Sequence, residues 1–125
     1  MNEINCKISD AEWVVMKVLW EESPLTSTAI IEALNPKTNW SPKTIHSLIS
    51  RLVKKEAIGI NKDFSQFKFY PLVEKKDCVM EETRSFIHKV FDGSLQLMLS
   101  NFIDNEKLSK NEIEELQRLL NERMK

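Results

Sequence analysis

The stretch from Trp40 to Lys55 constrains the fold of this chain more than any other. Ser41 suits an N-cap, and Pro42 fits the first position of a helix, where its missing N–H would have no partner anyway. The apolar residues that follow recur at helical spacing and form one inward stripe: Ile45, Leu48, Ile49, Leu52 and Val53. The pattern predicts an amphipathic helix over residues 41–55.

The outer face of this predicted helix carries short hydroxyls and long cations, and no acid occurs before Glu56. Its residues are Lys43, Thr44, His46, Ser47, Ser50, Arg51 and Lys54. A helix that lies in a DNA groove needs such a face, because cations bind phosphates and short donors reach the edges of bases. A surface helix with Lys and Ser for solubility fits this segment alone equally well, so the rest of the chain has to decide.

The net charge of −1 conceals a basic block in the middle of the chain. Residues 37–76 carry nine Lys and Arg against three acids, a net charge of +6. Residues 1–36 carry a net charge of −4, and residues 77–125 carry −3. A basic block between acidic flanks localises a polyanionic partner to the middle third of the chain.

Two shorter helices are predicted before the basic one. Ser9 and Glu12 form a capping box for a helix over about residues 10–22, and Thr26 or Ser27 caps a second helix that ends at Asn35-Pro36. Together with the helix over residues 41–55, they predict a helix-turn-helix.

The residues that follow predict a β-hairpin. Gly59 is available for a positive φ where the helix ends, and residues 58–63 and 67–73 show the apolar and aromatic pattern of two strands joined by a turn. A hairpin directly after a helix-turn-helix indicates a winged helix. Lys62 near the tip and Lys68 on the returning strand would reach DNA phosphate, although lysines on edge strands also protect a sheet from aggregation.

Three more amphipathic helices are predicted over residues 75–92 and 94–103 and after Ser109, where Glu112 completes a second capping box. Such helices form little core as a lone appendage, so pairing with a second copy is the simplest arrangement, and packing back on the winged domain is the alternative. The residues expected to make the dimer are Phe86, Ile87, Val90, Leu95, Met98, Leu99, Phe102, Ile113, Leu116 and Leu120.

We therefore predict a mainly α fold with a small β-hairpin wing. A winged helix-turn-helix DNA-binding domain would occupy residues 1–73, and a three-helix dimerisation lobe would occupy residues 74–125. No apolar run approaches the roughly 20 residues of a membrane span, and no leader precedes the first capped helix, so we expect a cytoplasmic protein without membrane insertion.

The sequence predicts no catalytic, metal or cofactor site. It has only two glycines and lacks a Gly-rich phosphate loop, an HExxH or CxxC motif and a nucleophile elbow. His46 and His88 have no evident acid partner. Cys6 and Cys78 are too few and too far apart for a disulfide framework, so we expect two reduced thiols.

Four segments carry a resemblance to a known family: Asp10–Trp13, Trp40–Ile45, Arg51–Lys55 and Leu108–Leu120. Their combination resembles the BlaI/MecI family of penicillinase and methicillin-resistance repressors over nearly the whole chain. Copper-responsive repressors are similar too, but they carry a CxC tail that is absent here.

The resemblance implies a homodimeric repressor of antibiotic-resistance genes that binds a palindromic operator in double-stranded DNA. It also implies that a membrane sensor-protease triggers cutting of the repressor at an Asn-Phe pair, which Asn101 and Phe102 match here.

We expect DNA contacts from eight residues of the helix and the wing: Ser41, Lys43, Thr44, His46, Ser47, Arg51, Lys62 and Lys68. Two other functions remain open. A winged-helix regulator could sense a small ligand directly, in a cleft lined by the apolar face of residues 95–103. A winged helix could also serve as a protein-interaction module.

Overall fold

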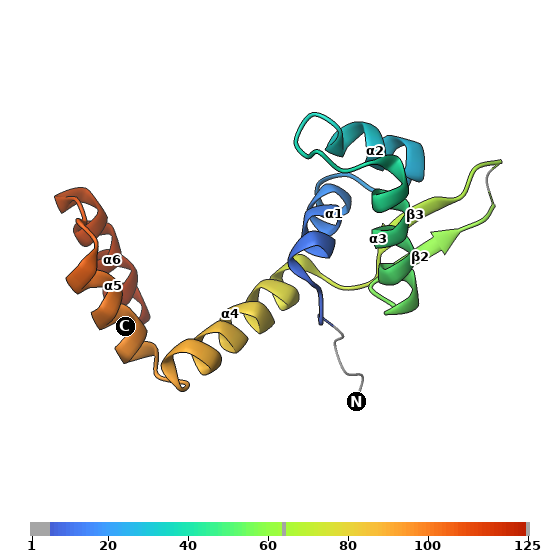
Figure 1. Cartoon of the computed structure of the whole chain (residues 1–125). Coiled ribbons are helices and arrows are strands. Elements are labelled where there is room, and N and C mark those ends of the chain that lie inside the picture. The colour runs from blue at the N-terminus through green and yellow to red at the C-terminus, as the bar shows by residue number, and fades with distance from the viewer. Residues whose placement is uncertain (1–5, 64, 125) are drawn as a thin grey trace. The chain divides into compact units, whose positions relative to one another are not determined.

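The computed structural model describes residues 6–63 and 65–124 (Figure 1). Its contacts divide the chain into two compact units, Met1–Glu82 and Thr83–Lys125, called here the winged unit and the helical unit. The fold is mainly helical with one small antiparallel sheet, as predicted. The predicted domain boundary between residues 73 and 74 stays a prediction. The contacts place the first two turns of the helix after the wing in the winged unit, which ends at Glu82.

Three helices of the winged unit begin at the predicted caps. Helix α1 (Asp10–Glu21) has the capping box of Ser9 and Glu12, and α2 (Ser27–Leu34) is capped by Thr26. Helix α3 (Pro42–Lys54) has Ser41 as its N-cap and Pro42 in its first turn. Local sequence chemistry therefore sets where each helix starts.

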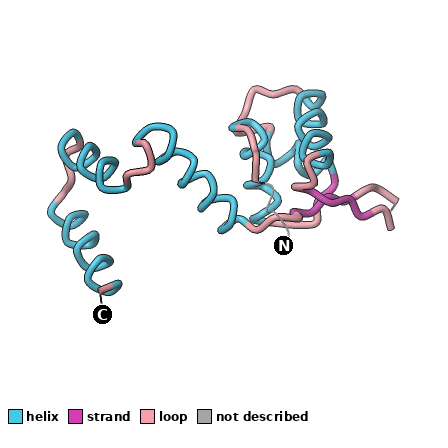
Figure 2. The backbone as a smooth tube through the Cα atoms, turned by 90° about the horizontal axis from the view of Figure 1, so that it is seen from below, coloured by secondary structure: helices cyan, strands magenta, loops and turns pink. Residues whose placement is uncertain are grey.

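The wing is a hairpin of β2 (Ile58–Asn61) and β3 (Lys68–Pro71), which extends away from the three helices (Figure 2). Both strands are shorter than predicted, and Phe64 of the predicted turn lies outside the described residues. A third strand, β1 (Leu25–Thr26), pairs with β3 and gives the sheet order β1-β3-β2. Two residues are too few for the alternating pattern that identifies a strand in sequence.

The role predicted for Gly59 is wrong. The positive φ after α3 belongs to Glu56, at 64°, whereas Gly59 lies within β2 opposite Tyr70. A Cβ at position 59 would come within 2.5 Å of the Tyr70 ring. Gly59 therefore serves a close cross-strand approach, and not the turn that ends the helix.

The core of the winged unit lies between α1, α2 and α3 and the sheet. Its fully buried side chains include Met16, Leu19, Ile30, Ile45 and Leu52. The rings of Trp13 and Trp20 meet edge to face with centroids 5.3 Å apart. These contacts hold α3 by its apolar stripe and leave its opposite face at the surface.

The expectation of two separate reduced thiols is wrong for this structure. Cys6 and Cys78 form a disulfide with Cα atoms 5.1 Å apart. Their separation of 72 residues in sequence gave no sign of proximity. In the fold, however, the segment before α1 lies beside the first turn of the helix that follows the wing. Both side chains are buried in the core cluster.

Three helices follow the wing: α4 (Lys75–Phe91), α5 (Leu95–Asn105) and α6 (Lys110–Arg123). Ser94 caps α5, and Ser109 with Glu112 forms the predicted capping box of α6. No described side chain of α5 or α6 is buried in the single chain. Among the described residues, no helix is long and apolar enough to cross a membrane.

Candidate nucleic-acid interface

The outer face of α3 is built on a tight N-terminal cap. The Ser41 hydroxyl accepts a hydrogen bond from the Thr44 N–H at 3.2 Å and lies 3.1 Å from the Thr44 hydroxyl. Pro42 lies in the first turn, where it contributes no surplus N–H. The helix N-terminus, with its partial positive charge, is therefore capped and exposed to solvent.

The predicted α3 contacts all lie on one exposed face. These residues are Ser41, Lys43, Thr44, His46, Ser47 and Arg51. The side chains on the opposite face, including Ile45, Leu48 and Ile49, are buried. Helix α3 itself contains no acid, so its exposed face combines hydrogen-bond donors with positive charge.

An ion pair fixes the C-terminal end of α3 to α1. Lys55 Nζ lies 2.5 Å from Glu12 Oε1 and 3.0 Å from the Lys7 carbonyl oxygen. Burial disfavours the charge on Glu12, but hydrogen bonds with Lys55 and Ser9 outweigh it and hold the Glu12 pKa below its usual value. Glu12 Oε2 is buried without a hydrogen-bond partner among the described residues. The pair sets the position of α3 from behind its exposed face.

The wing presents one lysine more openly than the other. Lys62 is exposed, and its Nζ lies 5.5 Å from the centroid of the Phe67 ring, a cation–π arrangement near the hairpin tip. Lys68 is half-buried in β3, where it pairs with Asn61 on one side and Thr26 on the other. Lys62 is therefore the better placed of the two for a DNA backbone.

A depression that the sequence analysis did not single out lies between the start of α2 and the wing. Its volume is about 380 Å³, and it is lined by Thr26, Ser27, Thr28, Ser65, Gln66, Phe67 and Phe69. In sequence, the hydroxyl run at residues 26–28 indicates only a helix cap, which is one of its roles, since Thr26 accepts a hydrogen bond from the Ala29 N–H. The other side of the depression is formed by residues of the wing, which only the tertiary fold brings beside the start of α2.

The predicted dimer residues of the helical unit are largely exposed in the single chain. The exposed ones are Phe86, Val90, Leu95, Leu99, Phe102, Ile113, Leu116 and Leu120, whereas Ile87 and Met98 are half-buried. Asn101 and Phe102 lie on α5, and Phe102 is 52% exposed. The Asn101 carbonyl accepts a hydrogen bond from the side-chain amide of Asn105, through Nδ2, at 2.7 Å.

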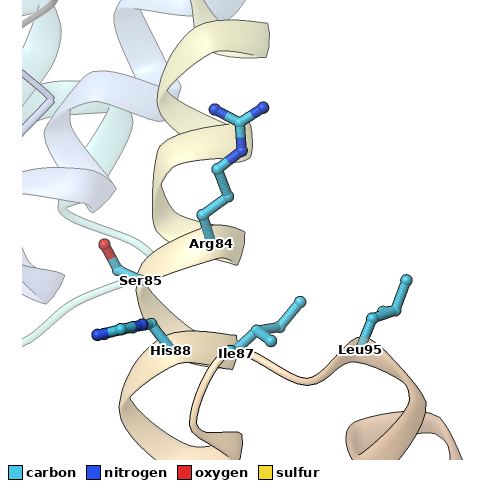
Figure 3. A pocket seen from close by; sticks show the side chains of 6 residues that line it. Arg84, Ser85, Ile87, His88 and Leu95 are labelled. Carbon is cyan, nitrogen blue, oxygen red and sulfur yellow. The ribbon is translucent and has the colours of Figure 1, made fainter.

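An open depression of about 480 Å³ lies between the end of α4 and the start of α5 (Figure 3). Ile87 and Leu95 extend to one side, while Ser85 and His88 point to the other side of α4. These side chains do not converge as they would around a small polar ligand. Across the described residues, no group of three His, Cys, Asp or Glu side chains has the arrangement of a metal site.

Comparison with known sequences gives long matches. The model of the family described as penicillinase repressor matches residues 8–122. The methicillin resistance regulatory protein MecI of Staphylococcus aureus strain N315 is 41% identical over 123 residues, 98% of this chain and 100% of that protein. The penicillinase repressor of Bacillus licheniformis is 38% identical over 116 residues, 93% of this chain and 91% of that protein.

Comparison with solved structures gives a match of the same family that covers 62% of this chain. The solution structure of the DNA-binding domain of the repressor BlaI is similar with a TM-score of 0.53 and 39% identity, covering 62% of this chain and 93% of that one. The monomeric form of Bacillus licheniformis BlaI in complex with the blaP half-operator gives the same values.

Proposed function

The chain belongs to the penicillinase repressor family, and we propose from this that it is a DNA-binding transcriptional repressor of β-lactam-resistance genes. The observation that carries the proposal is a family match over residues 8–122 that includes α3 with its acid-free, exposed outer face. Transcriptional repressors are not a class of enzymes. Because a repressor works on DNA, we place the protein in the cytoplasm.

The reading element of this repressor is α3, lying in the major groove. Lys43 and Arg51 would bind phosphate or guanine, while Thr44, His46 and Ser47 would reach base edges. The N-terminus of α3 at Ser41 would hold a phosphate, because its N–H groups and partial positive charge face outwards. Lys62, and to a lesser degree Lys68, would contact the backbone beside the groove. The similar BlaI domain in complex with a half-operator supports this mode of binding.

The second part of the proposal is a homodimer made by the helical unit. The apolar side chains of α4, α5 and α6 stay exposed in one chain, which supports a second copy as their cover. A two-fold dimer would present two α3 helices to successive major grooves about 34–36 Å apart, so its operator would be palindromic. Tethering makes the second half-site contact effectively intramolecular and raises the affinity.

The third part concerns release of the operator. A cut between Asn101 and Phe102, triggered by a membrane sensor-protease, would sever α5 and detach α6 from the rest of the helical unit. The bond lies within helix α5, so a protease reaches it only after local opening. The cut would therefore weaken the dimer and leave α3 unchanged.

Operator binding tests the proposal directly. Mobility-shift and footprinting assays on the promoter of the protein's own operon should reveal one protected palindrome at moderate salt. Lys43→Ala should weaken binding and reduce the slope of log K against log salt by about one unit, because one phosphate contact is lost. Lys17→Ala, which removes an exposed cation from α1, is the matched control and should leave the slope unchanged. A chain that protects no palindrome contradicts the proposal.

A further inference from the structure

A buried pair of cysteines joins the segment before α1 to the first turn of α4, and neither residue is among the proposed DNA contacts. Cys6 is 5% exposed and Cys78 is 0% exposed. Their Cα atoms lie 5.1 Å apart, within the range over which two cysteines can bond without movement of the backbone. The described residues contain no free cysteine.

The backbone on both sides of this pair is held by contacts that do not involve sulfur. Lys55 Nζ binds the Lys7 carbonyl at 3.0 Å, next to Cys6. On the other side, the indole N–H of Trp20 donates to the Val73 carbonyl at 3.0 Å, just before α4 begins. The N–H of Cys78 donates to the Glu74 carbonyl at 3.2 Å. Because these anchors hold both sites, the two sulfurs stay close to one another whether or not they are bonded.

We propose that Cys6 and Cys78 are a thiol–disulfide exchange site whose oxidising partner is a low-molecular-weight disulfide. The Cys6 thiolate attacks one sulfur of that disulfide, which forms a mixed disulfide and releases one small thiol. The Cys78 thiolate then attacks Cys6 Sγ, which forms the internal bond and releases the second small thiol. The chain loses two electrons and two protons, and the small disulfide gains both.

The order of attack follows from burial. Cys6 retains some exposure, whereas Cys78 has none, so the small disulfide meets Cys6 first. Cys78 then needs no access to solvent, because its target is the Cys6 sulfur beside it. Reduction runs in the opposite direction, with a small thiol attacking Cys6 Sγ.

Reversibility follows from where the protein works. Small thiols keep most protein cysteines in the cytoplasm reduced, and the disulfides that form in that compartment are mostly transient or redox-sensing. This step rests on the proposed function as a DNA-binding repressor, whereas the exchange chemistry itself does not. The bond would close only when the small-molecule thiol pool becomes oxidised.

Closure changes the start of α4. The bond ties the first turn of α4 to the segment that leads into α1, so this turn can no longer separate from the core without opening the N-terminal segment too. It also closes a long loop in the unfolded chain, which raises the stability of the winged unit. Oxidation would therefore stiffen the place where the chain leaves the DNA-reading unit.

The test uses the full-length chain in buffers of reduced and oxidised glutathione. After rapid alkylation, mass spectrometry should count two free thiols in reducing buffer and none in oxidising buffer, with no bound glutathione. The thermal midpoint should rise by about 10 °C on oxidation and return on reduction. Amide exchange over residues 75–80 should slow at least roughly tenfold when the bond closes. Two free thiols at the oxidised extreme, or glutathione left bound to Cys6, would overturn the proposal.

Two variants separate the exchange from a general effect of oxidation. Cys6→Ser, at the less buried position, should fold and show no rise in midpoint on oxidation. Cys78→Ala lacks the resolving thiol, so in oxidising buffer it should keep one glutathione on Cys6 and gain no stability. A midpoint that rises on oxidation in either variant would contradict the assignment. Failure of operator binding would leave these thiol counts unchanged, so the two proposals fail separately.

The anchors supply a further variant. Trp20→Phe keeps an aromatic ring but removes the N–H that holds Val73. The value of [GSH]²/[GSSG] at half-closure should fall by about fivefold, because one hydrogen bond no longer positions Cys78. An unchanged value would overturn the role given to the anchors.

Discussion

The two units of this chain use their apolar residues in opposite ways. In the winged unit, Ile45, Leu52 and Met16 pack into a shared core and are almost wholly inaccessible. In the helical unit, comparable residues such as Phe102 and Leu120 are 52% and 62% exposed. The winged unit has a core of its own, whereas the described residues of the helical unit form well-capped helices without a buried interior in one chain. Helix formation and core formation are therefore separate properties, and in a single chain the helical unit shows only the first.

The largest effect is expected from removal of the helical unit. A chain that ends at Glu82 should remain folded, sediment as a monomer and lose roughly 10²–10⁴-fold in affinity for a full palindrome, because the two reading helices are no longer linked. Affinity for an isolated half-site should change little and serves as the control. A truncated chain that binds the palindrome as tightly as the full chain would show that the helical unit does not make the dimer.

A single charged substitution in the helical unit should disrupt the dimer almost as strongly as the truncation. Leu116→Asp introduces a carboxylate into the proposed dimer face of α6. The dissociation constant of the dimer should therefore rise by at least about 100-fold, while the winged unit keeps its stability. Analytical ultracentrifugation measures the first effect, and thermal denaturation of the monomer measures the second. Asn111→Asp adds the same charge to an exposed position of α6 on the face opposite Ile113, and it should leave the dimer intact. Equal effects of the two variants would exclude Leu116 from the interface.

The two faces of α3 should separate stability from binding. Ile45→Ala removes a fully buried side chain and should lower the free energy of unfolding by about 2–5 kcal/mol, whereas Lys43→Ala should change it by less than about 0.5 kcal/mol. Urea denaturation of both variants measures the difference. If Lys43→Ala proved equally destabilising, Lys43 would belong to the scaffold of the unit.

The ion pair behind α3 should make the winged unit sensitive to acid. The Glu12 pKa is lowered on folding, so the charged carboxylate stabilises the fold above the unfolded pKa, and this contribution is lost as the pH falls through the lowered value. Glu12→Gln should cost about 1–3 kcal/mol at pH 7, and the difference from the unmodified chain should shrink as the pH falls towards 3. Thermal midpoints across this range test the sign. A difference that grew on acidification would contradict it.

The smallest expected effect compares one kind of substitution in both units. Glu56 and Asp92 both have a positive φ, at 64° and 52°, which glycine adopts without strain. Glu56→Gly should raise the stability of the winged unit by up to about 1 kcal/mol. Asp92→Gly should leave that stability unchanged, because it lies in the helical unit. Matched thermal scans of the two variants test the independence of the units.

The helices could be predicted from the sequence because their signals are local. Ser9 with Glu12, Ser41 with Pro42, and Ser109 with Glu112 each lie within four residues of the bonds they make, so no tertiary information was needed. The inward stripe of α3 was equally legible, because burial follows the helical period.

The features missed from sequence depend on residues brought together by the fold. Strand β1 has two residues and exists only because β3 lies beside it. Gly59 is needed because of the Tyr70 ring on the neighbouring strand. The Cys6–Cys78 pair spans most of the winged unit. The fold leaves the predicted DNA contacts of α3 and Lys62 of the wing exposed and Lys68 half-buried, and their roles stay predictions.

The pairing of Trp13 with Trp20 makes the chain its own optical probe. All three tryptophans lie within the first 40 residues, so intrinsic fluorescence and near-ultraviolet dichroism from indole report on the winged unit alone. The Trp20 indole also donates to the Val73 carbonyl, so its emission responds to the solvation of the turn that leads into α4. Events in α5 and α6 are silent in these signals unless they reach that turn. A dye attached to the helical unit would supply the second channel, and the two signals could then be followed in one sample.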